Sequence, residues 1–102
     1  MRLIVFFDLP VDTALQRKSY RVFRKFLIKD GYLMMQESVY SKMVLDGAAA
    51  ESAITRLRKN RPSQGLVQVL KVTEKQFSSI VDIAGHRGDE GVIDNSDRVV
   101  VL

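Results

Sequence analysis

The chain of 102 residues contains no cysteine and one histidine. Without cysteine it can form neither a disulfide nor a thiolate metal site. His86 has no second histidine with which to share a metal ion, and we expect it to be solvated in a glycine-rich segment. The sequence also lacks a Ser–His–Asp set, a P-loop and a Gly-x-Gly-x-x-Gly motif, which disfavours nucleophilic catalysis and nucleotide binding.

Long hydrophobic runs are absent as well. The N-terminal apolar run, Leu3–Phe7, has five residues, too few for a signal peptide or a membrane span. We therefore expect a cytoplasmic protein with no membrane partner. The length, with 46% hydrophobic and 27% charged residues, predicts one globular domain with a modest core.

Positive charge is concentrated in the first part of the chain. Residues 1–61 contain twelve Lys or Arg and six Asp or Glu, whereas residues 62–102 contain four and six. A basic first part suits a polyanion such as nucleic acid. The slightly acidic remainder suits a different partner, such as a protein.

The run Leu3–Phe7 ends in a carboxylate, Asp8, followed by Pro10. A short unbroken apolar run that stops at a proline predicts a strand buried on both faces. Asp8 would then lie where a central sheet meets solvent. Two interpretations remain open: Asp8 is a ligand for Mg²⁺ or a similar ion, or it caps the following turn or helix.

Apolar spacing and breakers predict the other elements. We expect a helix over 14–29 capped by Asp12 or Thr13, strands at 32–37 and 39–45, a helix over 48–60, a strand at 65–72, a helical turn capped by Thr73, and a further short strand at 80–84. This order predicts an α+β, ferredoxin-like βαββαβ sandwich with two helices on one sheet face. The other face needs a cover, so we expect a two-fold homodimer.

The first helix has an apolar and a basic side. Leu15, Tyr20, Phe23 and Leu27 recur at helical spacing and are expected to face the core. No acid occurs between Thr13 and Lys29. The basic residues fall within an arc of roughly 140°, which predicts nucleic-acid binding through the phosphate backbone. They are Arg17, Lys18, Arg21, Arg24, Lys25 and Lys29.

The chain is expected to divide into a ferredoxin-like domain, 1–84, and a segment of 85–102 that contains a flexible loop and a C-terminal strand. An unpaired strand of that composition would aggregate, so it should have a partner. We expect it to make dimer or partner contacts through Arg98, Val99, Val100, Val101 and Leu102.

Several motifs together resemble the small CRISPR-associated adaptation protein family (Cas2). They are Val5–Pro10, Arg17–Lys18, Gly31–Tyr32, Gln36–Lys42 and Leu70–Phe77. The resemblance covers roughly residues 1–84 and is strongest to members of single-effector systems, the Cas-nine type. One position departs from the pattern: many members have Tyr where this chain has Phe7. The missing hydroxyl removes a hydrogen bond expected near the metal and predicts weaker nuclease activity.

The resemblance implies a ferredoxin-like homodimer whose C-terminal strands cross to the partner. It implies that this dimer bridges two dimers of the CRISPR integrase, binds duplex DNA, and helps to insert new spacers. It also implies Mg²⁺ bound by Asp8 of both subunits and an endonuclease activity that includes RNA among its substrates. The alternative is a toxin-like, metal-dependent ribonuclease of the same fold that acts without an integrase.

Overall fold

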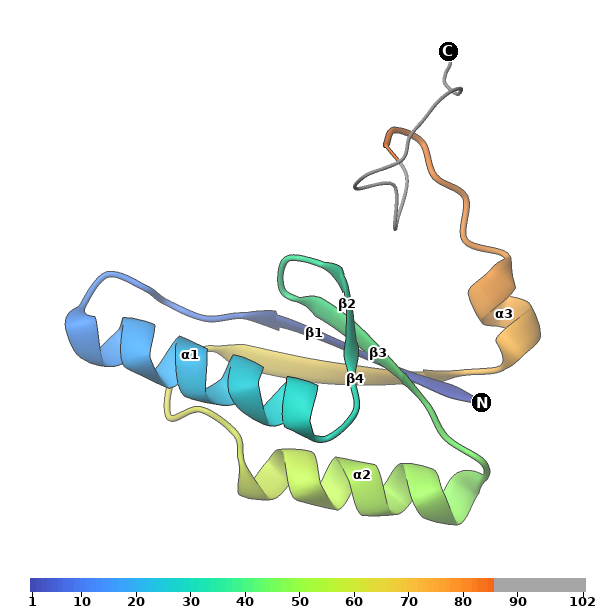
Figure 1. The fold of residues 1–102 in the computed structure, drawn as a ribbon, viewed down its shortest axis with the longest axis horizontal. Coiled ribbons are helices and arrows are strands. Elements are labelled where there is room, and N and C mark those ends of the chain that lie inside the picture. The colour runs from blue at the N-terminus through green and yellow to red at the C-terminus, as the bar shows by residue number, and fades with distance from the viewer. Residues whose placement is uncertain (86–102) are drawn as a thin grey trace.

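The computed structural model describes residues 1–85, and Figure 1 shows their fold. Two helices lie on one side of a four-stranded sheet whose order is β2-β3-β1-β4, and all neighbouring strands are antiparallel. The predicted ferredoxin-like sandwich is confirmed. The elements are β1 (Arg2–Asp8), α1 (Ala14–Lys29), β2 (Leu33–Gln36), β3 (Val39–Met43), α2 (Gly47–Lys59), β4 (Leu66–Val72) and α3 (Glu74–Ser78).

Local capping explains where the helices begin. Thr13 caps α1: its side chain accepts from the Gln16 N–H, and the Gln16 side chain accepts from the Thr13 N–H. Thr73 and Gln76 form the same capping box at α3, and Asp46 caps α2. Each box satisfies amide groups that the first helical turn leaves without partners.

The core lies between the helices and one face of the sheet. Leu3, Val5 and Phe7 of β1 are buried there. They pack with Phe23 and Leu27 of α1, Tyr32, Tyr40 of β3, and the inner side of α2. The predicted burial of Tyr20 is only partial. Leu15 was expected in the core and is 79% exposed, because it lies in the first turn of α1 at the margin of the apolar side.

The prediction that β1 is buried on both faces is wrong for the described chain. Side chains alternate along a strand, so those of Ile4 and Phe6 point away from the helices. Register places Met43 opposite Arg2, Leu70 opposite Ile4 and Leu66 opposite Asp8, on that same side. We call this surface the open face; its large apolar side chains are Ile4, Phe6, Met43, Leu66 and Leu70.

Two further expectations concern the end of the chain. Residues 80–84, expected as a strand, have no regular structure, since no described strand lies beside them to supply ladder hydrogen bonds. The other predictions for the end of the chain lie outside the described residues. They concern His86, the loop after Gly85, and the strand expected from Arg98 to Leu102. Within residues 1–85, the helices are too short and too polar to cross a membrane.

Candidate nucleic-acid interface

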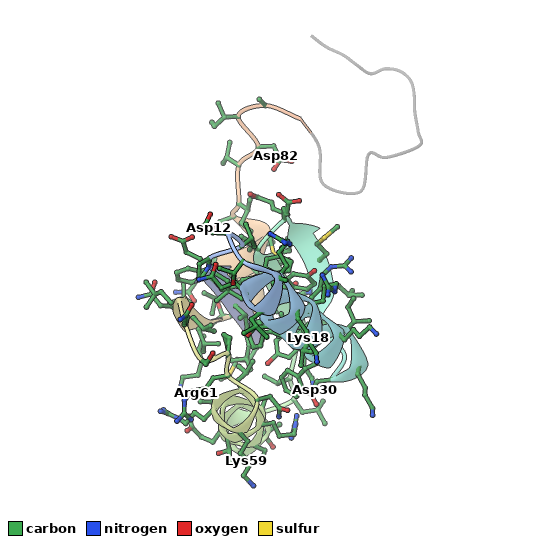
Figure 2. All side chains as sticks on the ribbon, turned by 90° about the vertical axis from the view of Figure 1, so that its left-hand side faces the viewer. Asp12, Lys18, Asp30, Lys59, Arg61 and Asp82 are labelled. Atoms are coloured by element: carbon green, nitrogen blue, oxygen red, sulfur yellow. The ribbon has the colours of Figure 1, made fainter. Side chains whose placement is uncertain are left out.

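All six basic residues of α1 are exposed. Successive residues are rotated by about 100° around the helix axis. The three arginines therefore lie within about 60° of one another around the axis and the three lysines within about 40°, which makes two ridges about 90° apart. The arginine ridge contains Arg17, Arg21 and Arg24, and the lysine ridge contains Lys18, Lys25 and Lys29. Figure 2 looks nearly along α2 and shows Lys18 on α1, with Lys59 and Arg61 at the near end of α2.

Two of the arginines are held by neighbouring groups. Nη1 of Arg17 donates to the carbonyl oxygens of Val11, at 3.1 Å, and Asp12, at 3.2 Å. Nε of Arg24 donates to the Tyr40 hydroxyl at 2.9 Å. Neither contact neutralises the guanidinium charge, because none of the acceptors is ionised. Both side chains therefore remain cationic while losing freedom of movement.

The other four cations of α1 have no hydrogen-bond or ion-pair partner among residues 1–85. They are Lys18, Arg21, Lys25 and Lys29. Because α1 contains no acid, like charges repel along its exposed side. A polyanion would relieve that repulsion and displace its own counterions.

The basic surface continues toward the end of α2. Lys18 and Arg61 line the same hollow of about 260 Å³ between α1 and the loop after α2. Arg61 donates to the Arg58 carbonyl at 2.7 Å, and the side chain of Arg58 is exposed. Arg56 belongs to another contact, because its Nε lies 2.9 Å from the Asp30 carboxylate.

Asp8 lies at the exposed end of β1, and its side chain points to the open face rather than toward α1. Its carboxylate has no hydrogen bond or ion pair with any residue of the described chain. The capping interpretation is therefore wrong, because Thr13 performs that function for α1. The structure also separates Asp8 from the basic ridges, which lie on the other side of the sheet.

Residues 1–85 alone do not form a metal site at Asp8. Residues 1–85 contain no group of three or more His, Cys, Asp or Glu side chains that could hold an ion. A single exposed carboxylate supplies few of the oxygen ligands of Mg²⁺, and the others come from a further carboxylate, water or substrate phosphates. A second copy related by a two-fold axis through the open face is the arrangement that would add another Asp8.

The side chain of Phe7 does not lie beside that of Asp8. Its ring is 8% exposed and faces the helices, where it packs edge-on against Phe23 at 5.2 Å and stacks with Tyr40 at 5.9 Å. A hydroxyl at residue 7 would enter this aromatic cluster. The expected link between Phe7 and the environment of Asp8 is thus wrong, because consecutive strand residues point to opposite faces.

Comparisons with known proteins agree with this fold and its motifs. The family model described as "CRISPR associated protein Cas2" matches residues 1–80. The chain belongs to the Cas2 family. It is 50% identical to a protein of Treponema denticola across the whole of both chains. It is 46% identical to a protein of Streptococcus mutans serotype c over all of this chain and 93% of that one.

Both of those relatives are named CRISPR-associated endoribonuclease Cas2. Among solved structures, the Cas2 fold seen here is similar to that of Streptococcus pyogenes Cas2 at pH 6.5, with a TM-score of 0.64 and 19% identity. The likeness covers 82% of this chain and all of the other. Because the two sequences are 19% identical, this structural likeness supports a shared fold and carries no statement about function.

The structure adds a charged cluster that the sequence analysis missed. Asp30, at the end of α1, lies 3.5 Å from Nζ of Lys42 on β3 and 2.9 Å from Nε of Arg56 on α2. Beside it, the Tyr32 hydroxyl is buried and has no hydrogen-bond partner among the described residues. Burial, together with the negative charge of Asp30, raises the pKa of Tyr32 to about 12, although Arg56 acts in the opposite direction.

Proposed function

We propose that this Cas2 protein is a homodimeric scaffold that binds duplex DNA and bridges integrase dimers during acquisition of CRISPR spacers. The main support is the set of four cations on α1 that have no partner in the described chain. An ordinary solvated helix mixes both charge signs, whereas α1 has only one. The family to which the chain belongs is consistent with this role.

The open face supports the dimeric part of the proposal. Met43, Leu66 and Leu70 are each more than half exposed, and Phe6 is 37% exposed. A sheet face of this composition is an unusually apolar surface for a monomer. Packing two copies through it would bury these side chains and leave α1 of each copy on the outside, where a duplex can reach it.

Salt dependence of binding tests the role of α1. Each phosphate contact to duplex DNA contributes about −0.9 to the slope of log affinity against log salt concentration. Substituting Lys18, Arg21 and Lys25 together by glutamine should reduce the magnitude of this slope by about 3 and weaken binding at every salt concentration. Equilibrium titrations of a short DNA duplex at several salt concentrations measure both quantities.

A matched pair of variants controls for net charge. Lys25→Gln removes a charge from α1, and Lys75→Gln removes one from α3, where Lys75 is also exposed. We expect a slope change of about 1 for Lys25→Gln and none for Lys75→Gln. A triple variant that keeps the wild-type slope would show that α1 is not the binding surface.

The proposed integrase contact lies outside the described residues. We propose that the segment from Arg98 to Leu102 docks the integrase, since its apolar strand-forming sequence needs a partner. Deleting residues 97–102 should abolish co-purification with the integrase while leaving a folded dimer. Retained co-purification with the deletion variant would reject this contact.

A ribonuclease is the second candidate function. The names of the relatives favour it, and Asp8 is an exposed carboxylate that no described residue engages. Because residues 1–85 alone do not form a metal site, this candidate relies on two Asp8 side chains brought together in the dimer. Asp8→Asn should then abolish magnesium-dependent RNA cleavage and leave DNA binding unchanged; cleavage that survives the substitution comes from another site.

A further inference from the structure

Tyr40 and Arg24 form a contact that joins the core to the proposed binding surface. We infer that Tyr40 is a positioning residue, which holds the guanidinium of Arg24 ready for a phosphate of duplex DNA. This inference rests on the proposed function, and it assigns a part in DNA binding to a side chain that DNA itself would not touch. Three observations support it.

The first observation is that the Tyr40 ring is fixed on every side. Tyr40 is 1% exposed and lies on β3, where it pairs with Val5 of β1 and Met34 of β2. Its ring stacks on Phe7 with the centroids 5.9 Å apart. Close packing of this kind holds a core side chain in a rotamer minimum, so the hydroxyl oxygen keeps a defined average position beneath α1.

The second observation is the part of Arg24 that this hydroxyl engages. Nε donates to the Tyr40 oxygen at 2.9 Å, and the two Nη groups have no partner among residues 1–85. A guanidinium is planar and presents its donors as a rigid fork. Anchoring it at Nε therefore orients the remaining donors, which can bind two oxygens of one phosphate.

The third observation is the position of Arg24 on its ridge. Arg17, Arg21 and Arg24 follow one another at spacings of four and three residues, and Arg17 lies about 10 Å from Arg24 along the helix axis. Arg17 is also held, by the carbonyl oxygens of Val11 and Asp12. The ridge thus has an oriented guanidinium at each end, whereas the lysine ridge has no such contacts among the described residues.

Orientation matters because a free arginine loses rotamer freedom when it binds. Holding the side chain beforehand removes part of that loss, and the effect of immobilising one long side chain corresponds to roughly three- to tenfold in affinity. We expect Tyr40→Phe to weaken DNA binding by about that factor, although it changes no charge and keeps the ring in the core.

A double-mutant cycle tests the inference. Binding of a short DNA duplex is measured for the wild type, Tyr40→Phe, Arg24→Ala and the double variant, at fixed salt. Arg24→Ala alone should weaken binding, and adding Tyr40→Phe to it should then have no further effect. Tyr20→Phe is the matched control, because Tyr20 belongs to the same aromatic cluster, 6.0 Å from Phe7, and should leave binding unchanged.

The outcomes separate the inference from the proposed function. A Tyr40→Phe variant that binds like the wild type, or one whose weakening persists without Arg24, overturns the positioning role. A wild type that fails to bind duplex DNA at low salt overturns the proposed function, and this inference with it. The same cycle on an RNA duplex completes the test, since coupling found only with RNA would contradict the assignment to DNA.

Discussion

Tyr32 lies at the junction of α1 and β2, with its backbone N–H donating to the Leu27 carbonyl at 2.9 Å. Burial and, after it, the negative charge of Asp30 raise the pKa of the phenol, and Nζ of Lys42 lies 5.5 Å from the ring centroid. The residue therefore fills space in the core while its polar atom remains without a partner in the described chain. A buried polar atom without a hydrogen-bond partner lowers the stability of the folded state.

The raised pKa of Tyr32 predicts alkaline sensitivity. An unfolded tyrosine titrates near 10, whereas folded Tyr32 titrates at about 12. Below pH 10 the phenol is neutral in both states and the free energy of unfolding does not depend on its titration. Between pH 10 and 12 only the unfolded state releases the proton, so the free energy of unfolding falls. Denaturant unfolding should show a decline over this range that is smaller in Tyr32→Phe, by up to about 2 kcal/mol.

At neutral pH the same variant should be more stable than the wild type by about 1 kcal/mol, because it removes a buried hydroxyl without a partner. Tyr20→Phe, whose ring is only half-buried, provides the comparison. Equal alkaline slopes for the wild type and Tyr32→Phe would contradict the account of this site.

Among the elements, β1 and β4 meet at a close approach beside Asp8. Gly65 has a φ of 94°, and a Cβ added there would lie 2.6 Å from the Asp8 carbonyl oxygen and 2.7 Å from Cδ2 of Leu9. Glycine is the residue that reaches this conformation without steric penalty. The start of β4 can therefore lie directly against the end of β1, and this contact fixes the strand end that presents Asp8.

Gly65→Ala should destabilise the protein by roughly 2 to 3 kcal/mol, from backbone strain and the clash with Asp8 and Leu9. Gly47→Ala is a matched control, because Gly47 begins α2 and a Cβ there would meet nothing within 4 Å. We expect that control to be neutral or slightly stabilising. Chemical denaturation of both variants measures the difference, and equal stability would reject the close approach.

Sequence alone predicts the elements well where the determinants are local. The bounds of α1 follow from Thr13, Gln16 and the chain reversal at Gly31, all of which lie within a few residues of the helix ends. The contact between Arg24 and Tyr40 joins residues 16 positions apart on two elements. Its existence depends on how α1 lies across β3, which helical periodicity does not specify.

The same limit applies to Asp8 and Phe7. Their position at the end of a central strand could be predicted from the apolar run and Pro10. That they point to opposite faces follows from strand alternation, but which face meets the helices depends on how the whole sheet packs. The exposure of Leu15 was missed for a similar reason, since the margin of an apolar helix side is buried only where a neighbour covers it.

For the whole molecule, the open face determines the assembly we propose. Phe6→Glu places a charge at its centre and should convert a dimer to a monomer, because burying an unpaired carboxylate is strongly unfavourable. Leu15→Glu is the control, since Leu15 is 79% exposed on α1. Sedimentation analysis should give a monomer for Phe6→Glu and a dimer for Leu15→Glu and the wild type. A dimer that persists in Phe6→Glu would place the interface elsewhere.

The two candidate functions depend on groups that lie on different sides of the sheet. A scaffold needs the basic ridges of α1, whereas a nuclease needs Asp8 on the open face. Because these groups lie on different sides of the molecule, each can be changed without disturbing the other. Spacer insertion by the integrase can therefore be compared directly for Asp8→Asn and for the triple glutamine variant of Lys18, Arg21 and Lys25.

The most direct test is a spacer-insertion assay with the cognate integrase, duplex DNA and three forms of this protein. We predict that the wild type and Asp8→Asn support insertion equally, and that the triple α1 variant does not, although it remains a dimer. Insertion that is lost in Asp8→Asn but retained in the α1 variant would contradict the scaffold account.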